Sequence, residues 1–313
     1  MRVFALIFHS PVFKSYWSAL ALFFVLALAS PSARAQSLGY EGPTGVFVTP
    51  LASTASSPDK GFGKPVVGYH FIAGGDTLGD YQTVSVTEGF AKRYEFGYTS
   101  EFHAGSNQLP QETSYYYQGF QIVHGKANLV VENAGKTKWV PAISVGTIYR
   151  FNDHQLYDGN QWSSGGKNYQ QTSSNADFYV VGTKVFTGIK KVPVLFNAGL
   201  RGTNASLWGL AGNAPGYSAR GFGALAFIFT LPNKSTLILG SEASQQPNQV
   251  LANNVAVPSA DLSIITSVVY AARFVPSPKH KLNIDVGVLH ASDGRQNVGN
   301  AKDRAAFGLS YAF

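Results

Sequence analysis

Nine charged residues occupy the polar positions of segments in which apolar and polar side chains alternate. Five are basic and four are acidic, so together they can form ion pairs or bias the passage of ions through a wet interior. These candidate lumen-lining residues are Arg93, Glu95, Glu101, Arg150, Lys184, Arg201, Glu242, Arg273 and Asp285. These residues would act through their charges, and the nine together carry an excess of one positive charge.

Sequence motifs for catalysis or cofactor binding are not found. The chain has no G-x-S-x-G or H-E-x-x-H motif, no phosphate loop and no calcium loop. G-F-G-A-L-A at residues 221–226 has the spacing of a dinucleotide fingerprint, but it lies in an alternating segment with no helix after it. The seven histidines occur singly and there is no cysteine. We therefore predict no metal, no cofactor and no catalytic residue.

The charged residues stand in segments whose hydrophobicity repeats every two residues. In residues 93–102, aromatic side chains at positions 94, 96, 98 and 102 alternate with polar or small ones. In residues 281–289, Leu282, Ile284, Val286 and Val288 share one parity. A period of two puts the two groups on opposite faces of a strand. A soluble sandwich and a membrane barrel both show this alternation.

The connections between the segments favour a barrel. We predict twelve strands, at residues 64–73, 81–89, 93–102, 119–132, 138–151, 176–187, 192–203, 219–231, 235–244, 262–275, 280–290 and 305–313. Five connections have three to five residues and six have seven to 24, and the two kinds alternate. Short turns on one side and long loops on the other are typical of outer-membrane barrels. The predicted fold is all-β, a closed antiparallel transmembrane β-barrel of about 12 strands.

The composition suits a sheet that faces lipid. Hydrophobic residues make up 45% of the chain and charged residues only 13%, which excludes intrinsic disorder. After residue 36 no run approaches the roughly 18 apolar residues of a spanning helix. A sheet in hydrocarbon must close and present an apolar outer face, where an exposed Arg or Lys would cost about 2–4 kcal/mol at the midplane. The nine charged side chains are therefore expected inside, in a wet or salt-bridged lumen.

The first 35 residues have the pattern of a secretory signal peptide. Arg2 and Lys14 accompany an apolar run at residues 16–29, and A-R-A at residues 33–35 is a small-x-small cleavage site. An anchoring helix is the alternative, but the run is short and no stop-transfer pattern follows. Removal of three basic residues lowers the net charge from +7 to +4, which gives no reason to expect nucleic acid as a partner. The predicted division is a signal peptide at 1–35, an N-terminal segment at 36–63 and the barrel at 64–313.

The last nine residues form a two-faced strand. Gly308, Leu309, Tyr311 and the terminal Phe313 resemble the assembly signal of Gram-negative outer-membrane β-barrels. Phe307 departs from that pattern, because a polar residue is common there. The resemblance implies a location in the outer membrane of a Gram-negative bacterium, with its lipid and the barrel assembly machinery as partners. A terminal Phe that arose by chance is the alternative.

Residues 39–50, G-Y-E-G-P-T-G-V-F-V-T-P, resemble the N-terminal signature of an uncharacterised bacterial family, a domain of unknown function. The resemblance implies an outer-membrane barrel without an established activity. The glycines and prolines around residues 46–48 indicate a short extended piece between turns. Two placements stay open, a constriction inserted into the lumen or a periplasmic lead-in to the barrel.

Three functional classes fit this architecture. The first is a narrow pore or transporter for small solutes, because twelve strands lie between filled eight-stranded barrels and open porins of 16–18 strands. The second is a non-conducting structural or adhesion barrel that acts through its extracellular loops. The third is an outer-membrane hydrolase, which architecture alone does not exclude. We predict the pore, with its solute unnamed, and no enzyme.

Overall fold

The computed structural model describes most of the chain after the predicted signal peptide, which lies outside the described residues. The described residues are 37–73, 80–104, 119–151, 161–164, 167–170, 174–187, 192–205, 217–246, 266–276, 281–291 and 303–313. These ranges contain fourteen strands and one short 3-10 helix. Among the described residues, no helix is long and apolar enough to cross a membrane.

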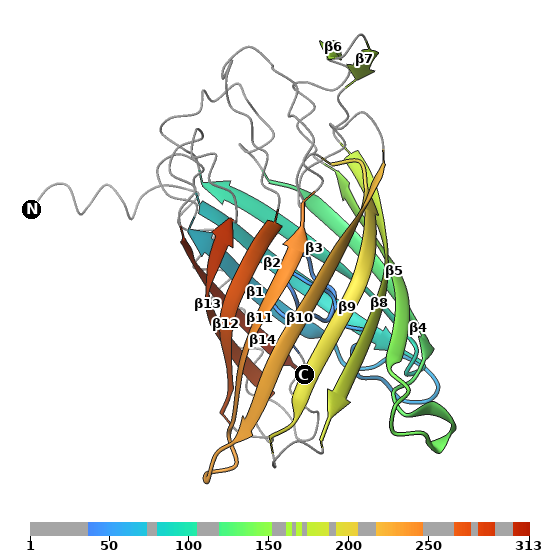
Figure 1. Cartoon of the computed structure of the whole chain (residues 1–313), viewed down its shortest axis with the longest axis vertical. Coiled ribbons are helices and arrows are strands. Elements are labelled where there is room, and N and C mark those ends of the chain that lie inside the picture. The colour runs from blue at the N-terminus through green and yellow to red at the C-terminus, as the bar shows by residue number, and fades with distance from the viewer. Residues whose placement is uncertain are drawn as a thin grey trace, which may run out of the picture.

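Twelve of the strands form one closed antiparallel sheet (Figure 1). They are β1 (Val66–Ala73), β2 (Asp80–Phe90), β3 (Tyr94–Ala104), β4 (Gln121–Val130), β5 (Ala142–Phe151), β8 (Ser174–Phe186), β9 (Val194–Thr203), β10 (Ser218–Thr230), β11 (Thr236–Gln245), β12 (Thr266–Val275), β13 (Leu282–Ala291) and β14 (Arg304–Ala312). The ring closes where β1 pairs with β14, with Val66 opposite Ala312. The predicted fold class is confirmed.

The two-residue repeat of the sequence becomes an apolar outer face and a largely polar inner face. On β3, Phe96 and Tyr98 are 41% and 46% exposed, whereas Glu95 and Thr99 are buried. Residues paired across antiparallel strands share a face, so the outward aromatic and aliphatic side chains extend from strand to strand. Closure also leaves no unpaired edge, which is the condition for a sheet in hydrocarbon.

The described short turns, which include residues 91–93 and 231–235, join strands at the lower end of the barrel in Figure 1. The turn between β2 and β3 contains Ala91 and Lys92, with φ of 50° and 57°. The connection between β4 and β5 contains the 3-10 helix η1 (Ala134–Lys136). Within the predicted loop 152–175, β6 (Gln161–Ser164) and β7 (Lys167–Gln170) form a separate hairpin that the hydrophobic pattern does not indicate.

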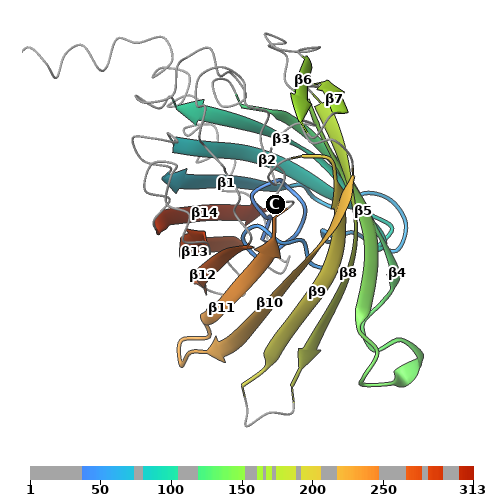
Figure 2. The same ribbon diagram turned by 45° about the horizontal axis from the view of Figure 1, so that its top comes forward.

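The chain before β1 fills part of the lumen. We call residues 37–57 the plug segment, and its blue trace lies inside the ring of strands (Figure 2). Its backbone bridges are internal, between Leu38 and Thr44 and between Gly45 and Pro50. It reaches the short-turn end near residue 57, where the Lys92 N–H donates to Ser57 Oγ at 2.8 Å. Of the two placements that the sequence left open, the structure has the one inside the lumen.

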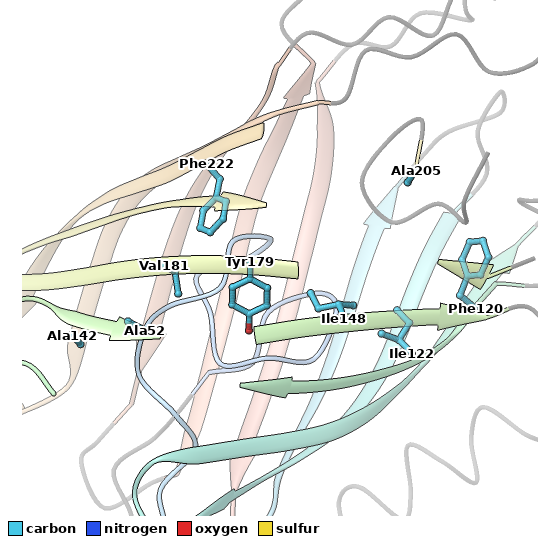
Figure 3. Close-up of a cluster of buried hydrophobic side chains, with 9 residues drawn as sticks. All are labelled: Ala52, Phe120, Ile122, Ala142, Ile148, Tyr179, Val181, Ala205 and Phe222. Carbon is cyan, nitrogen blue, oxygen red and sulfur yellow. The ribbon is translucent and has the colours of Figure 1, made fainter. Parts of the chain in front are cut away.

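Apolar side chains on the inner wall pack against the plug segment. One cluster combines Ala52 of the plug with wall and rim residues Phe120, Ile122, Ala142, Ile148, Tyr179, Val181, Ala205 and Phe222 (Figure 3). Two smaller clusters contain Leu38 and Phe47 of the plug. Full burial of a large apolar side chain contributes about 1.5–3 kcal/mol relative to exposure. The plug is therefore held partly by apolar packing.

Candidate functional site

The most highly charged part of the lumen surrounds Glu41 of the plug segment. Arg201 of β9 binds both carboxylate oxygens, with Nη1 to Oε2 at 2.7 Å and Nη2 to Oε1 at 3.0 Å. Arg150 of β5 contacts Oε1 through Nη2. Both arginines are fully buried and Glu41 is nearly so. Because an uncompensated buried charge costs several kcal/mol, the carboxylate of Glu41 depends on these two arginines.

Asp177 of β8 lies between the two arginines and orients them. Its Oδ2 accepts hydrogen bonds from Arg150 Nη1 and Arg201 Nε, each at 2.8 Å. Asn175 supports the group, since its Nδ2 donates to Asp177 Oδ1 at 2.6 Å and its Oδ1 accepts from Arg150 Nη1 at 3.2 Å. The strands β5, β8 and β9 are neighbours. The wall alone therefore positions both guanidinium groups.

Wall hydroxyls hold the plug backbone next to Glu41. Thr99 Oγ1 donates to the Glu41 carbonyl at 3.2 Å, and Thr87 Oγ1 donates to the Gly42 carbonyl at 2.8 Å. Gly42 has a φ of 104°, and a Cβ there would lie 2.3 Å from Thr99 Oγ1. This turn therefore requires glycine, and it directs Glu41 toward the arginines.

A second buried ion pair binds the middle of the plug. Lys126 Nζ of β4 lies 3.0 Å from Glu95 Oε1 of β3, and both side chains are fully buried. Glu95 also accepts from Thr44 N at 2.9 Å and from Ala55 N at 2.7 Å. Lys126 also donates to the Leu51 carbonyl at 3.1 Å. Plug and wall together satisfy both charges.

The carboxylate of Glu242 on β11 binds the tip of the plug. Its Oε1 accepts from Phe47 N at 3.2 Å and Val48 N at 2.6 Å. Its Oε2 accepts from Thr49 N at 2.8 Å and Thr49 Oγ1 at 2.6 Å. Successive backbone N–H groups that converge on one anion are a common anion-binding arrangement.

Arg273 of β12 links the plug to Asp285 of β13. Arg273 Nε donates to Asp285 Oδ1 at 2.7 Å, and its guanidinium also donates to the carbonyls of Gly45 and Val46. Asp285 Oδ2 accepts from Ser37 Oγ at 3.1 Å. This ion pair therefore anchors two separate parts of the plug.

Hydrogen bonds reach the plug from almost the whole circumference of the barrel. Leu38 N donates to Ser310 Oγ of β14 at 3.1 Å, and Ala52 N donates to Thr183 Oγ1 of β8 at 2.8 Å. With the contacts described above, at least ten of the twelve strands form hydrogen bonds with the plug. The plug thus spans the lumen.

Seven of the nine predicted lumen residues face the interior. They are Glu95, Glu101, Arg150, Arg201, Glu242, Arg273 and Asp285. The Arg273 side chain is 16% exposed, and the others are buried. The structure brings Arg150 and Arg201 together around one carboxylate, and it pairs Arg273 with Asp285.

The prediction is wrong for Arg93 and Lys184. Arg93 lies in the exposed turn before β3, where its Nη1 donates to the Asn128 carbonyl at 3.2 Å. Lys184 stands opposite the outward-facing Phe196 of β9, and its Nζ lies 2.8 Å from Glu132 Oε1 in the connection between β4 and β5. Inward residues of β8 have odd numbers, so Lys184 has the outward parity and reaches a carboxylate at the rim instead.

Sequence reasoning missed several lumen charges. The strands also turn Lys126, Asp177, Arg220 and Arg304 inward, and the plug adds Glu41. The alternation of each strand could have identified the four charged residues on strands, because each stands an even number of positions from inward-facing residues of the same strand. The described strands thus direct six basic and five acidic side chains into the lumen: Lys126, Arg150, Arg201, Arg220, Arg273 and Arg304 against Glu95, Glu101, Asp177, Glu242 and Asp285.

Three of the four proposed assembly residues lie on β14, and Phe313 directly follows this strand. They occupy both faces. Leu309, Tyr311 and Phe313 have the outward parity, and the rings of Tyr311 and Phe313 lie edge to face with centroids 5.1 Å apart. Gly308 faces inward, where a Cβ would lie 2.8 Å from His70 Cδ2. Recognition of this strand by assembly machinery stays a prediction.

In the described part of the chain, no three His, Asp or Glu side chains gather in an arrangement that could hold a metal ion. The two inward histidines have protein neighbours. His124 Nε2 lies 3.3 Å from Thr87 Oγ1, and the His70 ring lies edge to face with Phe47 at 5.3 Å. The chemistry that the geometry supports is recognition of charged and polar groups in a confined lumen.

Comparisons with known proteins give one family and several barrels. A family described as "Protein of unknown function (DUF3034)" matches residues 39–267, more than half of the chain. No curated protein matches.

Similar solved structures include the β domain of the Bordetella autotransporter BrkA, with 13% identity, a TM-score of 0.36, and coverage of 81% of this chain and 100% of that chain. The translocator domain of autotransporter NalP from Neisseria meningitidis has the same identity and TM-score, with coverage of 81% and 89%. OmpT, an outer membrane protein of Vibrio cholerae, has 10% identity, a TM-score of 0.33, and coverage of 85% and 99%.

Proposed function

This chain belongs to the DUF3034 family, and we propose that it forms a narrow outer-membrane pore for small solutes that its own plug segment closes at rest. The apolar outer face would contact lipid, with the short turns on the periplasmic side and the long connections outside. The signal peptide would direct export and be removed near Gln36. The N-terminal segment 36–63 would then gate the barrel domain 64–313.

The observation that carries this proposal is the polarity of the inner wall around the plug. Buried ion pairs can often be replaced by apolar side chains with no loss of stability, so a barrel that never opens has no need of them. Here the wall presents charged groups together with hydroxyls such as Thr83, Ser85 and Ser144. Such a wall is compatible with water once the plug leaves, which favours a solute path.

The attachment of the plug also favours reversible movement. The plug forms no ladder with the barrel strands, because its backbone bridges are internal. Its polar contacts exchange with water at a net cost of about 0.5–1.5 kcal/mol for a neutral hydrogen bond and about 1.5–3 kcal/mol for a bond to a charged group. The plug can therefore leave the lumen while the twelve-stranded sheet stays intact.

Single-channel recording in planar bilayers tests the pore. The mature chain is expected to conduct poorly, and a variant that lacks residues 37–57 is expected to give larger, steady openings. Heat-modifiable migration on a gel controls for folding, because a closed sheet resists unravelling. A folded deletion variant without conductance or solute uptake would overturn the pore in favour of a non-conducting structural barrel. Hydrolytic turnover that depends on one Ser or His would favour the enzyme class instead.

Cell fractionation tests the location. The mature protein, which starts near Gln36, is expected in the outer-membrane fraction and to migrate differently before and after heating. Its recovery from the soluble periplasm would overturn the membrane assignment.

A further inference from the structure

We propose that Arg150 and Arg201 form a binding site for small carboxylate anions, and that Glu41 occupies this site as an internal ligand while the plug is in place. The inference rests on the proposed pore and names its substrate class. Its structural basis is the carboxylate of Glu41, which the plug carries into a site built by the wall.

The geometry around Glu41 is that of carboxylate recognition. Arg201 presents two N–H groups to the two oxygens, at 2.7 Å and 3.0 Å, and Arg150 reaches one of the same oxygens from a second strand. A planar guanidinium matches the two oxygens of a planar carboxylate, and such paired bonds are stronger and more specific than single ones. A free carboxylate in the position of Glu41 would form the same bonds.

The wall keeps the site assembled without the plug. Asp177 accepts hydrogen bonds from both arginines, so their positions do not depend on Glu41. Two guanidinium groups and one wall carboxylate leave one positive charge, which one bound anion neutralises. Within the described part of the chain Arg150 Nε has no hydrogen-bond partner, so the site also keeps a donor that the plug does not use.

Docking of the plug and binding of the anion exclude each other, because both use the same N–H groups. A carboxylate solute would therefore bind the unplugged state alone and shift the equilibrium toward it. The solute would thus promote the opening of its own path, and Glu41 would set the concentration at which this occurs.

The first test is rescue of Glu41→Ala by acetate. The full mature chain is refolded in detergent, and thermal unfolding is followed with increasing sodium acetate, against sodium chloride at equal ionic strength. Acetate is expected to raise the unfolding temperature of Glu41→Ala in a saturable manner, beyond the effect of chloride. The wild-type chain is expected to respond to both salts equally, since Glu41 fills the site. Equal responses of Glu41→Ala to the two salts would overturn the site.

The matched control is Glu41→Ala combined with Arg201→Gln. The half-saturating acetate concentration is expected to rise at least about tenfold, which corresponds to about 1.4 kcal/mol of binding free energy. An unchanged value would show that acetate binds elsewhere and would overturn the assignment to these arginines. If Glu41→Ala fails to fold, the same titration is carried out on the barrel that lacks residues 37–57, whose wall retains the site.

Recording from that plug-deleted barrel separates this inference from the proposed function. Acetate is expected to reduce its chloride current in a saturable manner, and Arg150→Gln with Arg201→Gln is expected to abolish the effect. Conductance without a specific acetate effect would overturn the carboxylate site and leave the pore standing. Saturable rescue of Glu41→Ala by acetate in a barrel that never conducts would overturn the pore and leave the site standing.

Discussion

Thr49 of the plug and Glu242 of β11 are 193 positions apart in the chain, yet the Thr49 N–H and hydroxyl both donate to one oxygen of the Glu242 carboxylate, at 2.8 Å and 2.6 Å. The other oxygen accepts the N–H groups of Phe47 and Val48. One wall side chain therefore accepts four hydrogen bonds from three successive residues of the plug tip.

Glu242→Gln is expected to loosen the tip of the plug. Hydrogen bonds to a charged acceptor contribute about 1.5–3 kcal/mol, and the amide also directs its own N–H groups at backbone donors. Since the chain has no cysteine, Val48→Cys gives a single site for maleimide labelling. Labelling is expected to be about tenfold to a hundredfold faster in the Glu242→Gln background. Ser241→Ala, on the outward face of the same strand, is the control, and equal rates in the two backgrounds would contradict the role of Glu242.

Lys126→Met is expected to destabilise the folded barrel strongly. The substitution removes the only cation that the described ion pairs give to Glu95, and breaking a buried pair from one side costs about 3–5 kcal/mol. Three hydrogen bonds from Thr44 and Ala55 remain on Glu95, which favours the lower end of that range. Urea titration of the protein folded into lipid vesicles measures the change.

Lys92→Met is the matched control for that experiment. Lys92 also forms an ion pair, with Asp59 at 2.6 Å, but the two side chains are 59% and 83% exposed. Water and salt screen such a pair, so its loss is expected to leave the unfolding midpoint almost unchanged. Similar losses for both variants would show that burial does not decide the strength of these pairs.

The wall of the barrel could be predicted from the sequence because the direction of each side chain depends on its position within its own strand. Alternation with a period of two follows directly from a strand with one face toward lipid, and it placed all twelve strands within a few residues of their bounds. It failed at Arg93, where the turn after β2 runs to residue 93, and at Lys184, where a rim carboxylate attracts an outward side chain. The hairpin of β6 and β7 carries no comparable hydrophobic pattern.

The plug site could not be predicted in the same way, because its contacts join residues that are distant in the sequence. Glu41 and Arg201 are 160 positions apart, and nothing in the alternation of either segment links them. The G-P-T-G stretch indicated a turn-rich extended piece, but the alternation could not decide whether that piece enters the lumen. The three-dimensional closure of the sheet brings these groups together.

Replacing Tyr311 and Phe313 by Ser is expected to reduce the amount of membrane-inserted protein strongly. The two rings lie against each other on the outward face of the last strand, where the proposed assembly signal would be read. The heat-modifiable fraction in outer membranes measures insertion. Normal insertion of the double variant would contradict a role of these aromatic residues in assembly.

Ser310→Ala separates insertion from plug docking on the same strand. Ser310 faces inward, and its hydroxyl accepts the Leu38 N–H at 3.1 Å. The variant is therefore expected to insert normally while residues at the start of the plug become more accessible to added protease. Reduced insertion would show that the inner face of this strand also takes part in assembly.

Gly42→Ala is expected to displace Glu41 and weaken the closure of the plug. Two effects act together, since Gly42 has a φ of 104° and a new Cβ would lie 2.3 Å from Thr99 Oγ1. Gly61 is the matched control, because it has a φ of 92° but no atom within 4 Å of an added Cβ, so Gly61→Ala carries backbone strain alone. Backbone strain of this kind costs about 1–3 kcal/mol, and only Gly42→Ala adds the clash beside the two arginines. Single-channel recordings are expected to show more frequent openings for Gly42→Ala than for Gly61→Ala. Equal opening frequencies would mean that the contact between this turn and the wall does not hold the plug in place.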